Sequence, residues 1–245
     1  IHADTGQVMG QAVRAHTTIT FGPPKLGQLL AAQHCGHLVV ETIGFPRQEL
    51  ESEEWPGQWM TPSLARRWLP LHGPFSNKRN TGKVLVIAGS TRYPGAGALA
   101  TLGALRAGAG LVFALGPAAL RLPLEAIPIP SCGDWLSKAD LPRILEKLEE
   151  VDALCLGPGL GTQPETLQVV RELLEKNPLP AVVDADALGG LPESLSPRVL
   201  LTPHAGELAR LLRAKASDLE KDRLRSAVQA ARNFNCTILF KGAAT

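Results

Sequence analysis

Aromatic residues are scarce in this sequence, since phenylalanine, tyrosine and tryptophan make up 4% of its 245 residues. So few rings argue against the stacking platforms that bind single-stranded nucleic acid. Neither sign of charge dominates, because 25 basic residues face 23 acidic ones and leave a net charge of +2. Without a basic stripe along the chain, we expect no nucleic acid partner.

Long apolar runs are also missing. Gly or Pro interrupts every apolar stretch well short of a membrane span, so we expect no membrane segment. The first residues show no charged segment followed by an apolar one, which argues against a secretory leader. The four cysteines are widely spaced without a Cys-x-x-Cys pair, as is typical of reduced thiols in the cytoplasm. His34, Cys35 and His37 form either a metal half-site or, as we favour, a polar turn before a strand.

Five short apolar runs each stop at a loop of small or polar residues. The runs are residues 84–88, 153–156, 181–183, 199–201 and 237–240, and the loops after them begin at Gly89, Gly157, Asp184, Thr202 and Lys241. Such runs predict strands that are buried on both faces of a parallel sheet. Because ligands bind beyond the carboxyl ends of these strands, we expect the five loops to line one crevice.

Helical patterns lie between the runs. Apolar spacing predicts helices over residues 96–109, 138–150 and 165–176, and a strand is expected at 111–115. Gly110 is expected to end the first helix and Ser137 to cap the second. A capping box at Ser217 and Glu220 predicts one long helix to about Asn233. The alternation of strands and helices indicates a doubly wound α/β domain over residues 76–245.

The first 75 residues are organised differently. Two β-branched strands, at 16–21 and 38–43, flank a short helix and bury too little for a core, so we expect residues 1–45 to be the tail of a larger domain. Residues 46–75 combine acidic residues, Pro and Trp and predict a linker. Within it, Thr61 is expected to cap a short helix that begins at Pro62.

Each strand-end loop has a functional and a structural interpretation. The glycine loops at 89–97 and 157–161 either bring backbone N–H groups to a ligand or make tight strand-to-helix turns. Asp184 and Asp186 hold a metal or a ribose hydroxyl, or cap the next helix. His204 either bonds a substrate or caps a helix. Lys241 either binds phosphate or is a surface lysine before a turn.

Taken together and in this order, the motifs resemble the NAD(P)H-hydrate dehydratase family, which has a ribokinase-like fold. The resemblance covers about residues 76–245 and rests on segments 84–90, 93–96, 105–112, 156–161, 184–188, 201–207 and 241–243. Residues 3–8, 13–15, 20–22 and 24–27 are similar to the end of the NAD(P)H-hydrate epimerase domain, which bacteria commonly fuse ahead of the dehydratase. The resemblance thus implies a piece of a bifunctional repair enzyme, truncated at both ends.

The resemblance implies that hydrated NADH or NADPH is the substrate. A nucleotide, ADP or in its place ATP, phosphorylates the added hydroxyl, and loss of phosphate restores the ring double bond. With ADP the products are NAD(P)H, AMP and phosphate. Mg²⁺, K⁺ for the epimerase part, a homo-oligomer and a cytoplasmic location are also implied. A ribokinase-like kinase of a vitamin precursor or sugar, and a non-catalytic nucleotide-binding module, stay open as alternatives.

By the same resemblance, Ala96, Gly159, Gly161 and His204 contact the hydrated dinucleotide. The nucleotide phosphates are held by Lys241, Gly242, Ala243, Ala244 and Thr245, and Glu207 is a candidate metal ligand. Three positions depart from the family pattern, with Gly189 in place of Asn, Ala205 of Pro and Ala244 of Gly.

The family's catalytic Asp is missing from the sequence. It belongs to a Gly-x-Gly-Asp motif, which we expect beyond Thr245, and the epimerase's Asp-x-Pro-Ser-Gly segment is absent as well. We therefore expect residues 1–245 by themselves to have neither activity.

Overall fold

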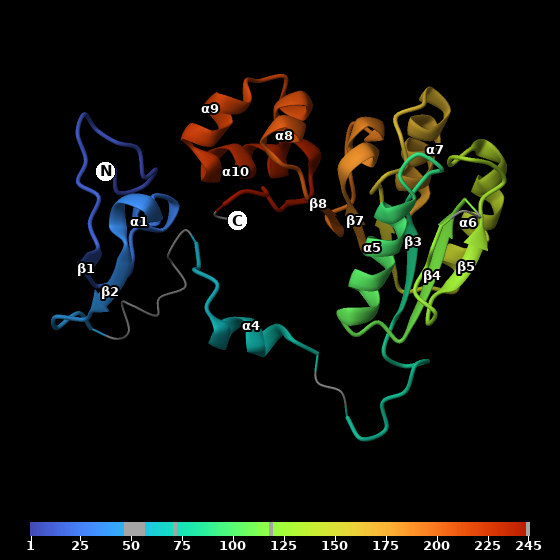
Figure 1. The fold of residues 1–245 in the computed structure, drawn as a ribbon, viewed down its shortest axis with the longest axis horizontal. Coiled ribbons are helices and arrows are strands. Elements are labelled where there is room, and N and C mark those ends of the chain that lie inside the picture. The colour runs from blue at the N-terminus through green and yellow to red at the C-terminus, as the bar shows by residue number, and fades with distance from the viewer. Residues whose placement is uncertain (47–56, 71–72, 118–119, 244–245) are drawn as a thin grey trace. The chain divides into compact units, whose positions relative to one another are not determined.

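The computed structural model describes residues 1–46, 57–70, 73–117 and 120–243 (Figure 1). The chain divides into two compact units, residues 1–71 and residues 72–243. The predicted linker, residues 46–75, spans this boundary, and its acidic cluster at 49–54 lies outside the described residues. Among the described helices, none combines the length and the apolar character needed to cross a bilayer.

The first unit is built around two parallel strands. Strand β1 (Thr17–Phe21) pairs with β2 (His37–Glu41), and helices α1 (Leu26–Leu30) and α2 (Ala32–Cys35) connect them. The prediction of a polar turn at 34–37 is wrong, because His34 and Cys35 end helix α2 and His37 begins β2. Helix α4 (Pro62–Trp68) starts as predicted, with the Thr61 hydroxyl accepting a hydrogen bond from the Leu64 N–H at 3.2 Å.

The second unit contains a seven-stranded sheet in which every pair is parallel. The strands are β3 (Lys83–Ile87), β4 (Leu111–Gly116), β5 (Ile127–Pro130), β6 (Ala153–Leu156), β7 (Ala181–Val183), β8 (Val199–Leu201) and β9 (Thr237–Ile238). Their order is β5-β4-β3-β6-β7-β8-β9, which confirms the predicted parallel α/β sheet. Strand β5 was not predicted. Its two prolines are tolerated because β5 lies at an edge, where only one neighbour pairs with it.

The carboxyl ends of the strands are aligned in one row across the sheet. Six residues pair in sequence along this row: Leu115, Ile87, Leu156, Val183, Leu201 and Ile238. The loops after β3, β6, β7, β8 and β9 therefore leave the sheet at the same edge, and neighbouring loops start side by side.

Helices cover both faces of the sheet. They are α5 (Pro94–Arg106), η1 (Lys138–Asp140), α6 (Leu141–Leu148), α7 (Pro164–Lys176), η2 (Ala185–Gly190), α8 (Ala205–Leu212), α9 (Ala216–Lys221) and α10 (Arg223–Phe234). Leu85 and Ile87 pack into the core that contains α6 and α7, whereas Val86 and Ala88 pack beneath α5. Consecutive residues of β3 thus face opposite layers, as expected of a run buried on both sides.

Of three predictions about helix boundaries, two differ from the structure and one is confirmed. Helix α5 ends at Arg106 rather than at Gly110, and Gly108 then adopts a φ of +100°. The cap at Ser137 is confirmed, since the Asp140 carboxylate accepts from both its N–H and its hydroxyl at 3.0 Å. The single helix from Ser217 is wrong. Asp222 separates α9 from α10 and caps α10 by accepting from the Arg225 N–H at 3.1 Å.

Candidate functional site

The loop after β3 packs tightly against the start of α5. Gly89 has a φ of +85°, and its N–H donates to the Pro158 carbonyl at 2.7 Å. A Cβ at Gly97 would lie only 2.7 Å from the Ala88 carbonyl oxygen, so glycine is what allows α5 to approach the strand so closely. Close packing therefore accounts for the glycine in the first turns of this helix.

The loop after β6 joins the ends of β3 and β7. A Cβ at Gly159 would come within 2.6 Å of the Ala96 Cβ, so these two predicted substrate-binding residues face each other. A Cβ at Gly157 would overlap the Asp184 carbonyl oxygen. The Gly161 N–H donates to Asp186 Oδ2 at 2.9 Å. Close approach at the glycines and a hydrogen bond to the Asp186 carboxylate thus hold the loops after β3, β6 and β7 together.

Both aspartates after β7 bond to other loops. Asp184 Oδ1 lies 2.6 Å from Lys241 Nζ, and the two side chains are 28% and 37% exposed. Within the described residues, the Asp184 side chain makes no capping bond to η2, so the capping interpretation of Asp184 is wrong. The ion pair reaches across β8, because Asp184 follows β7 and Lys241 follows β9. It brings the predicted phosphate-binding cation beside the loop after β7.

His204 and Glu207 cap helix α8 reciprocally. His204 Nδ1 accepts from the Gly206 and Glu207 N–H groups at 3.0 and 3.3 Å, and Glu207 Oε2 accepts from the His204 N–H at 2.8 Å. His204 Nε2 lies 3.4 Å from Glu207 Oε1. His204 thus caps a helix, as the structural interpretation predicts. Because its side chain is 57% exposed, the outer edge of the ring is still accessible to a ligand.

The loop after β9 is shaped by an arginine that the sequence reasoning missed. Arg223 donates to the Phe240 carbonyl at 2.7 Å and stacks on the Phe240 ring, with its guanidinium carbon 3.9 Å from the ring centre. The Lys241 N–H donates to the Pro203 carbonyl at 2.9 Å, and Gly242 and Ala243 are exposed. Ala244 and Thr245, both predicted phosphate ligands, lie outside the described residues.

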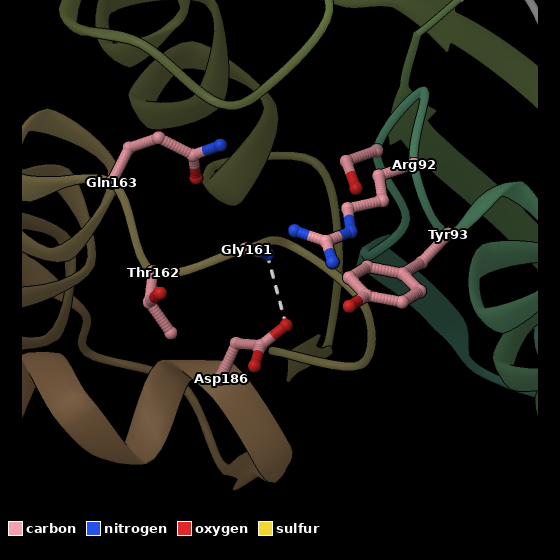
Figure 2. Close-up of a pocket in the computed structure, with 7 residues that line it drawn as sticks. Arg92, Tyr93, Gly161, Thr162, Gln163 and Asp186 are labelled. Carbon is pink, nitrogen blue, oxygen red and sulfur yellow. Dashed lines mark hydrogen bonds between the residues drawn. The ribbon is translucent and has the colours of Figure 1, made fainter.

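A cavity of about 360 Å³ opens between the loops after β3 and β6 (Figure 2). Its lining residues come from three loops: Ser90, Arg92 and Tyr93 after β3, Gly161, Thr162 and Gln163 after β6, and Asp186 after β7. Strands β3 and β6 are neighbours, and the chain continues from β3 toward one edge of the sheet and from β6 toward the other. The cavity therefore lies at the switch point of the sheet, where α/β proteins bind their ligands.

Two cavity residues that we did not predict have unused polar groups. Ser90 is 4% exposed, and its hydroxyl oxygen has no hydrogen-bond partner among the described residues. Arg92 is exposed and lies over the Tyr93 ring, with its guanidinium carbon 5.4 Å from the ring centre. In the sequence, only the position of Ser90 and Arg92 directly after strand β3 could have identified them. That position indicates a site only once the strand order shows that β3 is central.

The metal-ligating side chains at this edge of the sheet do not form a cluster in the described structure, and its thiol is not activated. Nowhere in the described ranges do three His, Cys, Asp or Glu side chains cluster closely enough to hold a metal ion, so Glu207 has a capping role and no companion ligands. Burial, with a smaller contribution from the charge of Asp184, raises the pKa of Cys155 to about 11. This thiol is protonated at neutral pH and is not an activated nucleophile.

The chain is similar to one well-defined group of proteins. Residues 84–245 match a family described as NAD(P)H-hydrate dehydratase. Two bifunctional NAD(P)H-hydrate repair enzymes are similar to the whole chain. The enzyme from Moorella thermoacetica is 38% identical to the chain and the one from Thermofilum pendens 37%, over 100% of this chain and 49% of each relative. The chain thus spans about half the length of the curated relatives it matches.

Solved structures show the same fold. An ADP/ATP-dependent NAD(P)H-hydrate dehydratase from Bacillus subtilis, co-crystallized with ATP and Mg²⁺, is 29% identical, with a TM-score of 0.61 over 74% of this chain and 65% of that one. A ribokinase-like protein from Enterococcus faecalis is 23% identical, with a TM-score of 0.60 over 71% of this chain and 62% of that one. The predicted ribokinase-like fold is confirmed.

Proposed function

The chain belongs to the NAD(P)H-hydrate dehydratase family, and from this we propose that it carries the substrate-binding and nucleotide-binding loops of an ADP-dependent NAD(P)H-hydrate dehydratase. The observation that supports this proposal most is the shared edge of the sheet. The loops after β3, β6, β7, β8 and β9 all leave the sheet there, a cavity lies at the switch point, and the last loop carries Lys241.

The proposed reaction needs two binding regions at this edge. The hydrated dinucleotide is placed against Ala96, Gly159, Gly161 and His204, and the ADP phosphates against the 241–245 loop. Support for the first region is the close approach of Gly159 to Ala96 and the cavity beside them. Support for the second is the Lys241 ammonium group, a point charge of the kind that binds phosphate.

Phosphorylation turns a poor leaving group into a good one. The nucleotide's terminal phosphoryl group passes to the hydroxyl of the hydrated ring, and the later loss of phosphate restores the double bond. Lys241 is suited to stabilise the charge that develops on the moving phosphoryl group. Its amine must leave Asp184 to do so, so nucleotide binding is expected to exchange one anionic partner for another.

Mg²⁺ is not assigned to a protein site in this proposal. The described residues offer no cluster of three ligands, and Mg²⁺ is commonly held by substrate phosphates with one or two carboxylates. Any ion present would supply charge neutralisation on the nucleotide, and no step proposed for the chain's own residues depends on it.

The test is recovery of NADH from hydrated NADH and ADP by the full-length gene product, followed by the near-ultraviolet absorbance of the restored ring and by AMP release. Restored NADH with stoichiometric AMP supports the proposal. A stable phosphorylated small molecule without NADH recovery would instead indicate a kinase.

The remaining assignments are also proposals. We assign residues 1–45 to the end of an epimerase domain, which would use K⁺, and 46–75 to a linker. Support comes from the bifunctional relatives, whose similarity extends over the whole chain. Epimerase turnover by the full-length gene product tests the first assignment. Analytical ultracentrifugation tests the proposed homo-oligomer, and cell fractionation tests the cytoplasmic location.

A further inference from the structure

We propose that the cavity between the loops after β3 and β6 recognises a ribose phosphate group of the dinucleotide, with Arg92 binding the phosphate and Ser90 and Asp186 binding hydroxyl groups. The proposal rests on the proposed function, because it concerns the same dinucleotide. It goes further by naming the part of the substrate that enters the cavity and two recognition residues, Ser90 and Arg92, that are not among the predicted site residues.

Arg92 has the properties of a phosphate ligand. No carboxylate in the described part of the chain lies within ion-pair distance of its guanidinium, which instead lies over the face of the Tyr93 ring. Figure 2 shows the side chain extending from the loop after β3 toward the loop after β6. A guanidinium with uncommitted N–H donors on a cavity wall is well matched to the oxygens of a phosphate.

Asp186 and Ser90 are suited to bind hydroxyl groups and not phosphate. One oxygen of the Asp186 carboxylate accepts from the Gly161 N–H, while the other makes no hydrogen bond with any described residue and is able to accept from a sugar hydroxyl. Ser90 has a buried hydroxyl with its bonding capacity unused in the described structure, which is unfavourable unless a ligand completes it.

The combination of these groups narrows the ligand class. A carboxylate oxygen repels phosphate and favours hydroxyl donors, whereas a guanidinium favours phosphate. A ligand that satisfies both must carry an anionic group and hydroxyl groups a few atoms apart. Ribose phosphates have this arrangement, and the cavity volume of about 360 Å³ is at the lower end for small-molecule sites, in keeping with one part of a dinucleotide.

The phosphate could be one of two groups in the substrate. The 2′-phosphate is present in hydrated NADPH and absent from hydrated NADH, whereas the pyrophosphate is common to both. Arg92→Gln in the full-length gene product separates these sources. We expect the KM for hydrated NADPH to rise by about 10- to 100-fold, the loss of a charge-assisted interaction. An equal rise for hydrated NADH identifies the pyrophosphate, and no rise identifies the 2′-phosphate.

Arg106→Gln is the matched control. Arg106 is exposed at the opposite end of α5, so the variant removes the same charge about 20 Å away from the cavity. Unchanged KM values for both substrates in Arg92→Gln would overturn the role of Arg92, as would equal effects of the two variants.

Calorimetric titration with NADP⁺ and NAD⁺ tests the cavity apart from the reaction. These probes carry the same ribose phosphates and need no turnover. If the protein binds them through Arg92 but restores no NADH, the recognition site stands and the proposed function fails. If the protein restores NADH but its Arg92→Gln variant binds both probes and both hydrated substrates normally, the proposed function stands and this inference is overturned.

Ser90→Ala provides a second, independent readout. We expect affinity for the dinucleotide probe to fall by about 5- to 30-fold. The thermal midpoint of the ligand-free protein should stay the same or rise, because the variant removes an unbonded buried hydroxyl. A hydroxyl with a purely structural role gives the opposite pattern, a lower midpoint with unchanged affinity, and that result would overturn the role of Ser90.

Discussion

At the scale of single residues, Asp140 is a buried carboxylate that is held by several hydrogen bonds. Its side chain is fully buried, and its oxygens accept from the Cys132 and Ser137 N–H groups and from the Ser137 hydroxyl. Burial alone would raise the pKa of this carboxyl, but the hydrogen bonds donated to it outweigh that effect and lower the pKa. Folding therefore stabilises the ionised form of the Asp140 carboxyl group.

Asp140→Asn should reduce the free energy of unfolding by about 1–3 kcal/mol at neutral pH, since an amide cannot accept all these bonds. A carboxyl whose pKa is lower when folded contributes stability above its unfolded pKa of about 3.9, and this contribution is lost as the pH falls through the folded value. Urea unfolding along a descending pH series should show the gap between wild type and variant narrowing. Parallel curves would contradict the argument.

The exposed Asp218→Asn serves as the control. Asp218 pairs with Lys221 at 2.8 Å, and both side chains are more than half exposed. Surface pairs of this kind contribute little, so the expected change is within about 0.5 kcal/mol at every pH.

Lys241 and Asp184 form the ion pair most directly linked to the proposed function. Because the side chains are partly exposed, Lys241→Ala should change the free energy of unfolding by less than about 1 kcal/mol. It should weaken ADP binding by about 10- to 100-fold, as expected for one charged contact to phosphate. Asp184→Asn removes a competing anion and should leave ADP affinity equal or higher. Calorimetric titration checks both, and equal losses in the two variants would disprove the competition.

At the scale of elements, the glycine loop after β6 depends on its backbone shape. Gly157 has a φ of +130°, and a Cβ there would overlap the Asp184 carbonyl oxygen. Gly157→Ala should therefore cost about 3 kcal/mol or more in the free energy of unfolding. Gly103→Ala in α5 is the matched control, because its Cβ meets no atom within 4 Å and alanine favours the helix by about 1 kcal/mol. Denaturant titration of both variants should give shifts of opposite sign.

The strands were predictable to different degrees. Residues 153–156, 181–183 and 199–201 were predicted with the bounds the structure has, because runs buried on both faces have no competing amphipathic pattern. Strand β5 was missed because Ile127–Pro130 lacks such a run and its prolines argue against a strand. The α9–α10 break was missed because Asp222 resembles an exposed helix residue until its bond to Arg225 is seen.

The candidate site was predictable in its loops but not in its contacts. Gly159 and Ala96 belong to motifs, and the structure brings them together. The Lys241–Asp184 pair joins residues 57 positions apart, and its existence depends on the order of β7, β8 and β9. For the same reason, the unbonded Ser90 hydroxyl has no signature in the sequence.

At the scale of the whole molecule, the two units differ in how much apolar surface they bury. The first unit has a two-stranded sheet with Ile19 and Phe21 60% and 51% exposed, whereas Leu85 and Leu156 in the second unit are fully buried. Small sheets with exposed apolar faces open easily. Hydrogen exchange by mass spectrometry on residues 1–245 alone should thus show slow exchange in β3 and β6 and much faster exchange in β1 and β2. Similar protection in both units would contradict this expectation.

The row of paired residues from Leu115 to Ile238 also limits how this protein can diverge or be redesigned. One residue inserted within a strand moves the root of its loop by about 3.3 Å and turns every later side chain to the opposite face. An insertion beyond the row leaves the strands untouched. Ligand preference can therefore change through replacement of the loops beyond this row, while the strands of the sheet stay as they are.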